Sequence, residues 1–189
     1  KNNARQTLIE KISSKNSLRR LNSKIEARIN FWIKPEPERL KTSDSCADYN
    51  LISDPADRYS NLRSEIVNIL ENINIQTTRH CHGALSSESS IGITGSNIID
   101  LADNVMITKF IIANVAESYG IQVKLSFSSK NNLSIIISGN KEDLNVMQKN
   151  LPEGLISNIA SGVSSYHLEL NASLEDQSEP HLLFVRLFS

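Results

Sequence analysis

The order of apolar and polar residues predicts a chain of strands and helices. Residues 24–33 alternate without a break, with isoleucine, alanine and phenylalanine on one face and charged or amide side chains on the other, which is typical of a half-buried strand. Apolar residues recur at helical spacing over residues 3–14 and 57–72. A longer helix is predicted from Ser96, its capping residue, up to Gly120, because glycine commonly ends helices.

The remaining segments give a less regular pattern. Strands are predicted over residues 74–82, 121–128, 132–138, 164–172 and 181–188, and short helices over residues 141–149 and 153–162, while residues 83–95 are small and polar. Strands that are adjacent along the chain favour an α+β fold, with a largely antiparallel sheet of about six or seven strands and helices packed on one side. We expect a single domain over residues 1–189.

Composition excludes several classes of protein. The chain has 189 residues, of which 39% are hydrophobic and 22% are charged, as in an ordinary folded domain. No window approaches the roughly 18 consecutive apolar residues of a membrane span, and the first residues lack the apolar core of a signal peptide. The two cysteines fit a reducing compartment. We therefore expect a cytoplasmic protein.

The charge is distributed unevenly along the chain. Residues 1–42 hold eleven lysines and arginines against four acids, and the rest of the chain holds nine against seventeen. A basic segment of this kind can bind nucleic acid, and a steep salt dependence of binding would then be its signature. We instead expect this segment to dock on the acidic remainder of its own chain.

The string His80-Cys81-His82 is the first candidate for chemistry. In a strand His80 and His82 share a face while Cys81 points away, so the three side chains cannot surround one ion. A metal site on the two histidines would need further ligands from elsewhere, and a reactive Cys81 would need a base on its own face. We expect ordinary histidines here and no catalytic group.

Four segments, taken in order, resemble the catalytic domain of glutamine synthetase. The clearest is Ala102-Asp103-Asn104-Val105-Met106, which continues through Lys109-Phe110 and resembles the long helix of that family. Asp57, Arg58 and Arg63 resemble its D-x-R segment, and residues 24–33 resemble the strand with its Glu-x-Glu-Phe motif. Cys81-His82-Gly83 and Ser90-Ile91 fall on its His-His-Glu and Glu-Ile, and Arg186 resembles the last Arg of its Asn-Arg-Ser-Ala-x-x-Arg motif.

The resemblance implies two divalent ions held by glutamates. The matching positions here are Arg28, Asn30, Gly83 and Ser90. Magnesium and manganese need anionic oxygen ligands, and Arg28 would repel a cation. We therefore expect no metal, no cofactor and no catalytic residue, and we expect the small N-terminal β-grasp domain of the family to be missing.

The resemblance leaves three functions open. The first is a non-catalytic protein of nitrogen metabolism that assembles with itself or with another protein. The second is a sensor of an amino acid or nucleotide, whose remnant cleft would be lined by Arg28, Asn30, His82, Ser90 and Arg186. The third is an ATP-dependent carboxylate-amine ligase with relocated metal ligands. Convergence of Arg28, Gly83, Ser90 and Arg186 on one site would support the second function.

Overall fold

The structure is a computed structural model, and it describes residues 3–14, 24–34, 57–83, 87–125, 133–139, 156–161, 166–171, 181 and 184–185. The helices are α1 (Ala4–Ser14), α2 (Ser60–Asn72) and α3 (Ile98–Ser118). The strands are β1 (Lys24–Ile33), β2 (Thr77–His82), β3 (Glu88–Thr94), β4 (Val123–Lys124), β5 (Leu133–Gly139), β6 (Ile156–Ser161) and β7 (Tyr166–Asn171).

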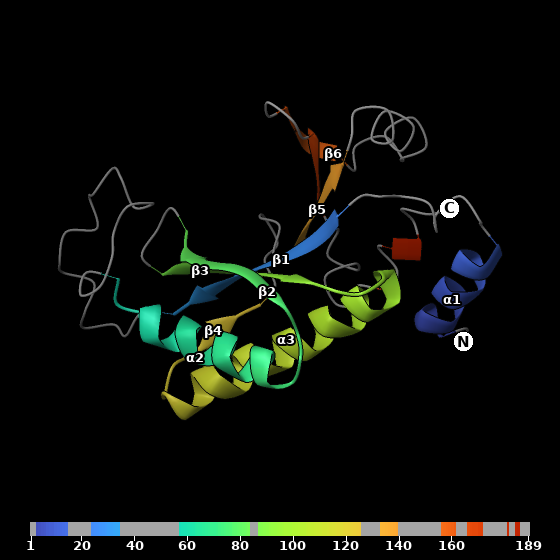
Figure 1. Ribbon diagram of the computed structural model, residues 1–189. Helices are drawn as coiled ribbons and strands as arrows, with labels where there is room; N and C mark the ends of the chain where they lie inside the picture. Colours follow the sequence, from blue (N-terminus) through green and yellow to red (C-terminus); the bar gives the residue numbers. More distant parts are fainter. Residues whose placement is uncertain are drawn as a thin grey trace.

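The strands form one seven-stranded sheet, in which β4 also pairs with β1 and the other strands follow the order β2-β3-β1-β5-β7-β6. Every described pair is antiparallel, and β1 lies between β3 and β5. Helices α2 and α3 lie side by side on the same side of the sheet (Figure 1). The predicted α+β fold with a largely antiparallel sheet is confirmed.

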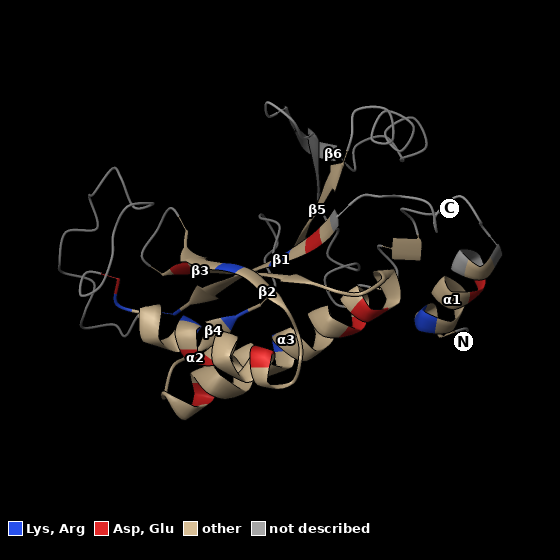
Figure 2. Ribbon diagram, viewed as in Figure 1, with Lys and Arg blue, Asp and Glu red and all other residues tan. Residues whose placement is uncertain are grey.

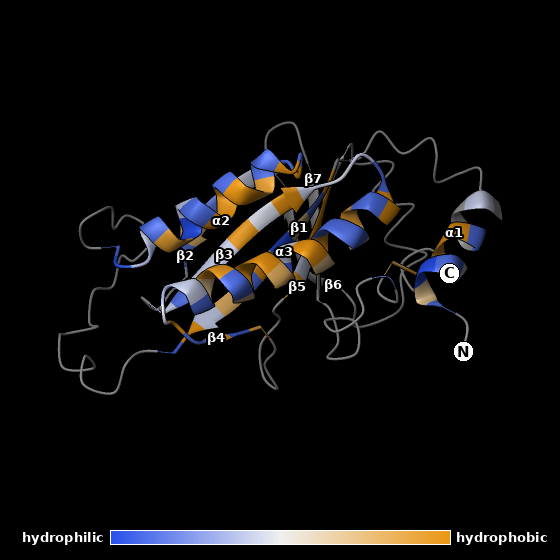
Figure 3. Cartoon of the chain, turned by 90° about the horizontal axis from the view of Figure 1, so that it is seen from below, coloured by the Kyte–Doolittle hydropathy of each residue, from blue (hydrophilic) through white to orange (hydrophobic). Residues whose placement is uncertain are grey.

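The core lies between the sheet and these two helices. Ala27, Ile29, Phe31 and Ile33 are buried in it, so the alternation of residues 24–33 places one face of β1 against the helices. Seen from the helix side, α2 and α3 lie across the strands and both carry apolar residues (Figure 3). Each buried isoleucine or phenylalanine contributes roughly 1.5–3 kcal/mol, so this layer is the main source of stability.

The ends of α3 follow from its sequence. The cap is Asn97, one residue later than the predicted Ser96, because the Asn97 side chain accepts hydrogen bonds from the backbone N–H groups of Ile99 and Asp100. The Ser96 hydroxyl instead bonds to the Asp100 carboxylate. At the other end, Gly120 has a φ of 67°, the left-handed conformation that glycine adopts at no steric cost.

Four predicted elements need correction. Strand β3 lies within residues 83–95, where no element was predicted, and only Val123–Lys124 of the predicted strand 121–128 is a strand. Residues 156–161 form β6 rather than a helix, because β7 pairs with them along their length. His181, Phe184 and Val185 are helical, and Phe184 packs into the core instead of extending the sheet. The predicted helix 141–149 lies outside the described residues.

The two ends of the described chain meet at α3. Arg5 of α1 donates hydrogen bonds to the Asp103 carboxylate, with Nη2 2.9 Å from Oδ2, and His181 Nε2 lies 2.9 Å from Oδ1 of the same carboxylate. Leu8 and Phe184 are fully buried beside this pairing, and we call these five residues the terminal clasp. The charged residues of α2 and α3 are mostly acidic (Figure 2), so the basic first helix does dock on an acidic surface.

Burial of Asp103 raises its pKa, but the hydrogen bonds from Arg5 and His181 act in the opposite direction, and the pKa lies below its usual value. Asp103 therefore stays charged in the clasp at neutral pH. Within the part of the chain that the structure describes, no helix is long and apolar enough to cross a membrane.

Candidate functional site

Three rows of residues cross strands β1, β3 and β2 on the sheet face that points away from α2 and α3. Residues that pair directly in an antiparallel sheet point to the same face, so each row brings three strands together. The rows are Arg28–Gly92–Arg79, Asn30–Ser90–Cys81 and Trp32–Glu88–Gly83. We call this surface, together with Glu26, the polar face.

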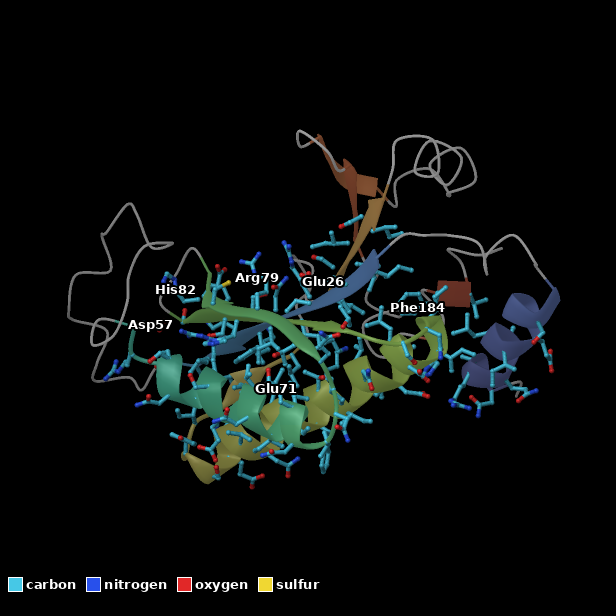
Figure 4. The ribbon with its side chains drawn as sticks, in the orientation of Figure 1. Glu26, Asp57, Glu71, Arg79, His82 and Phe184 are labelled. Carbon is cyan, nitrogen blue, oxygen red and sulfur yellow. The ribbon has the colours of Figure 1, made fainter. Side chains whose placement is uncertain are left out.

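The polar face contains most of the residues proposed from the sequence. Arg28, Asn30, Gly83 and Ser90 all lie on it, because the register of β1, β3 and β2 aligns them. These four residues are partly exposed, whereas the alternate residues of β1 are buried in the core. Figure 4 shows Arg79 on the side of the sheet opposite to α2 and α3.

Gly92 is the centre of a charged cluster. Arg28 Nε donates a hydrogen bond of 2.7 Å to Glu26 Oε1, in an ion pair whose side chains are 31% and 17% exposed. A Cβ atom at Gly92 would lie 2.9 Å from Arg79 Cγ and 3.0 Å from Glu26 Oε1. The bare glycine therefore lets Glu26 and Arg79 come together over one point of the sheet.

The other two rows are mainly neutral. Arg79 Nη2 donates to the Cys81 sulfur at 3.0 Å, which joins the first row to the second. In the third row Glu88 lies against Gly83, where an added Cβ atom would be 2.6 Å from Glu88 Oε2. Lys124 of β4 pairs with Trp32 on the other side of β1 from Glu88.

His82 does not join the polar face. It pairs with Ser89, which pairs with Phe31, and all three residues are buried on the helix side of the sheet. His80 pairs with Ile91 of the same side but is exposed at the edge strand β2. The grouping of His82 with Arg28 and Ser90 was therefore wrong in space, and Arg186 lies outside the described residues.

A buried ion pair supports β3 from below. The Arg63 side chain of α2 is 1% exposed; it pairs with the Asp57 carboxylate and donates to Ser89 Oγ at 3.3 Å. Ser89 is the neighbour of Ser90, so this contact links α2 to the strand that carries the second row. The D-x-R string of the sequence thus has a structural role here.

The largest pKa change lies away from the polar face. Burial lowers the pKa of Lys109 to about 8, but this residue is on α3, on the other side of the sheet. Sequence reasoning missed Glu26 and Arg79, which occupy the same face as the residues it chose. Their signal was the two-residue spacing from Arg28 and from Cys81.

Comparison with known proteins identifies the family. The family model for the glutamine synthetase catalytic domain matches residues 9–139, which is more than half of the chain. The chain belongs to this family.

Curated relatives match a shorter stretch of the chain. Glutamine synthetase of Azospirillum brasilense is 30% identical over 66 residues, and that of Methylococcus capsulatus is 33% identical over 67 residues. 3-Hydroxylaminophenol mutase of Cupriavidus pinatubonensis is 36% identical over 67 residues. Each match covers 35% of this chain and 14% of the first two relatives, so the chain spans a small part of their length.

Solved structures show the same fold over more of the chain. The cryo-electron microscopy structure of Plasmodium falciparum glutamine synthetase has a TM-score of 0.66 at 13% identity and covers 98% of this chain and 54% of its own. The complex of GmaS with ADP has a TM-score of 0.56 at 16% identity, over 71% of this chain and 33% of its own.

The residues of the polar face do not fit the divalent ions that the family resemblance implies. Arg28, Asn30, Gly83 and Ser90 supply no carboxylate at the matching positions, and Glu26 is bonded to Arg28. Among the described residues, no group of three or more histidines, cysteines and acids is arranged to hold a metal ion. No chemistry through a metal is derived for this face.

Proposed function

We propose that this chain is a non-catalytic member of the glutamine synthetase family that acts by binding. The observation that supports this is the Arg28–Glu26 ion pair on β1, where the family resemblance implies paired metal-binding glutamates. Arg28 repels a cation and also neutralises the nearest carboxylate. A phosphoryl transfer that relies on a divalent ion would lose most of its electrostatic stabilisation here.

The geometry also disfavours relocated ligands. Glu26 and Glu88 are the acids of β1 and β3 on the polar face. Glu26 pairs with Thr94, which is six residues from Glu88 along β3, so the two carboxylates are separated by about 20 Å. Two acids so far apart cannot share one ion. The two cysteines and the family relationship support a role in the cytoplasm, in nitrogen metabolism.

We expect the full chain to release no phosphate from ATP in the presence of glutamate, ammonium and magnesium or manganese, because the polar face lacks a set of anionic ligands. A coupled phosphate assay measures this, with an active glutamine synthetase as positive control. Phosphate release that depends on both ATP and the metal would contradict the proposal and would favour the relocated-ligand ligase. Stabilisation of Arg28→Glu by magnesium alone would likewise reveal a residual metal site.

Binding to a second copy of this chain is the mode of action that α3 supports. Met106, Ile107 and Phe110 lie on its outward face and are 43%, 41% and 68% exposed. These positions are neighbours on a helix, and a two-fold contact would bury the same apolar residues from both copies. Asp103, on the same face, is already paired with Arg5 and His181, so its charge does not oppose the contact.

We expect the chain to self-associate in a concentration-dependent way, and Phe110→Ser to shift it towards monomer. Sedimentation velocity measures both. The matched control is Ile73→Ser, which removes an apolar side chain of 47% exposure at the end of α2 and should leave association unchanged. A strict monomer at every concentration, or association that survives Phe110→Ser, would contradict this mode.

A second candidate function is binding of a small molecule to the polar face. It is favoured by the clustering of Arg28, Arg79 and neutral polar groups on three paired strands. Arginine side chains present planar sets of donors that suit carboxylates and phosphates. An amino acid or a nucleotide carries such a group, and thermal shift with glutamate, glutamine, ATP and AMP tests these compounds directly.

A further inference from the structure

We infer that the polar face binds one oxyanion, a carboxylate or phosphate group, over Gly92 between Arg28 and Arg79. This inference rests on the second candidate function and gives that function a ligand class and a position. It reverses the charge of the ligand at this place: two arginines on a bare glycine suit an anion, where the family resemblance implies cations. The residues that define the site are Arg28, Gly92, Arg79 and Glu26.

The backbone register places both arginines around an open position. Arg28 and Arg79 both pair with Gly92, from β1 and from β2, so their Cα atoms are about 10 Å apart, with one strand between them. Gly92 has no side chain to separate them. The Arg79 stem and the Glu26 carboxylate already approach this position to within 2.9 Å and 3.0 Å of where a Cβ atom would be. Any larger residue at position 92 would displace them.

The donors of this cluster exceed its acceptors. Among the described residues, Arg28 bonds only to Glu26, through Nε, and Arg79 bonds only to the Cys81 sulfur, through Nη2. Each guanidinium has five N–H donors, and a neutral thiol is a weak acceptor. Two guanidinium charges therefore share one carboxylate, and the fork-shaped donor sets of both arginines remain to be matched by anionic oxygens.

The surrounding charges limit the ligand to one anionic group. Glu88 lies two rows from Gly92, about 13 Å along the strands, and Lys124 pairs with Trp32 in that same distant row. On the other side, the register places Glu169 of β7 two strands from Glu26, opposite Ile136. A second anionic group would meet one of these acids. The neutral row that contains Asn30 and Ser90 lies next to the site and suits an uncharged polar part of the ligand.

The test is isothermal titration calorimetry of the full chain with inorganic phosphate and, separately, with acetate, at ionic strength matched with sodium chloride. Saturable binding of either probe is expected, and the tighter probe identifies the group as phosphate or carboxylate. Arg79→Gln should weaken binding by about tenfold, the effect of losing one charge-assisted contact. The matched control is Arg58→Gln, which removes an exposed arginine of the turn before α2 and should leave binding unchanged.

Arg79→Lys provides a second variant that keeps the charge but loses the planar donor set, and it should weaken binding by less than Arg79→Gln. Absence of saturable binding for both probes would overturn the inference, as would equal binding by Arg79→Gln and the parent chain or equal losses in Arg79→Gln and Arg58→Gln. These failures are distinct from that of the proposed non-catalytic function, which only metal-dependent phosphate release from ATP would contradict.

Discussion

Replacing Asp57 with alanine should lower the free energy of unfolding by about 3–5 kcal/mol, the usual cost of leaving a buried charge without its partner. Arg63 is 1% exposed, so water cannot take the place of the lost carboxylate. Its remaining described bond is to Ser89 Oγ at 3.3 Å, and its Nε already has no hydrogen-bond partner. Urea denaturation followed by circular dichroism measures the change.

Two further variants separate this effect from a general disturbance of the turn. Arg58→Ala, next to Asp57 but exposed, should change stability by less than about 0.5 kcal/mol. The double variant Asp57→Ala/Arg63→Met should recover part of the loss, because it removes the buried charge together with its partner. A double variant less stable than Asp57→Ala alone would show that Arg63 stabilises the fold through contacts other than this ion pair.

The Asp57–Arg63 pair also bears on the polar face. Arg63 contacts Ser89, and the next residue, Ser90, lies on the opposite side of β3 in the second row. Moving β3 relative to α2 would therefore move Ser90 relative to Asn30. If the anion site is present, Asp57→Ala should weaken it only indirectly, through the position of β3, and Arg79 should remain the residue whose loss matters most.

How far the sequence predicts this fold depends on where each strand obtains its pattern. Strand β1 was predicted at its observed bounds, because every second residue of 24–33 is apolar and the core lies on one side only. Strand β3 was missed because Ser89, Ser90 and Gly92 have weak strand preferences. It is a strand because β1 and β2 pair with it on both edges, and pairing between distant segments is not visible in a local pattern.

The candidate site shows the same division. The family resemblance brought Arg28, Asn30, Gly83 and Ser90 together correctly, since the order of segments carries information about pairing. It could not show that His82 faces the core, because that follows from the register of β2 against β3. Nor could it show that Arg79 and Glu26 meet over Gly92, since a bulge near Thr77 shifts the register that brings Arg79 opposite Gly92.

The terminal clasp makes a comparable demand on residues far apart in sequence. Leu8, near one end of the chain, and Phe184, near the other, are both fully buried in the same core cluster. Figure 4 shows Phe184 where α1 and the start of α3 meet. Asp103 holds Arg5 and His181 at the same place, so apolar packing and hydrogen bonding both attach the two ends to α3.

Phe184→Ala should therefore lower the free energy of unfolding by about 3–5 kcal/mol, because it removes a large side chain from a packed interior and leaves a cavity. Urea denaturation measures the loss, and Phe110→Ala is the matched control: the same change at a side chain that is 68% exposed should cost less than about 0.5 kcal/mol. Faster hydrogen exchange in α1 of Phe184→Ala should accompany the loss, since Leu8 shares the core cluster with Phe184. Equal stabilities of the two alanine variants would mean that the end of the chain is not part of the core, and the clasp would then rest on Asp103 and its hydrogen bonds alone.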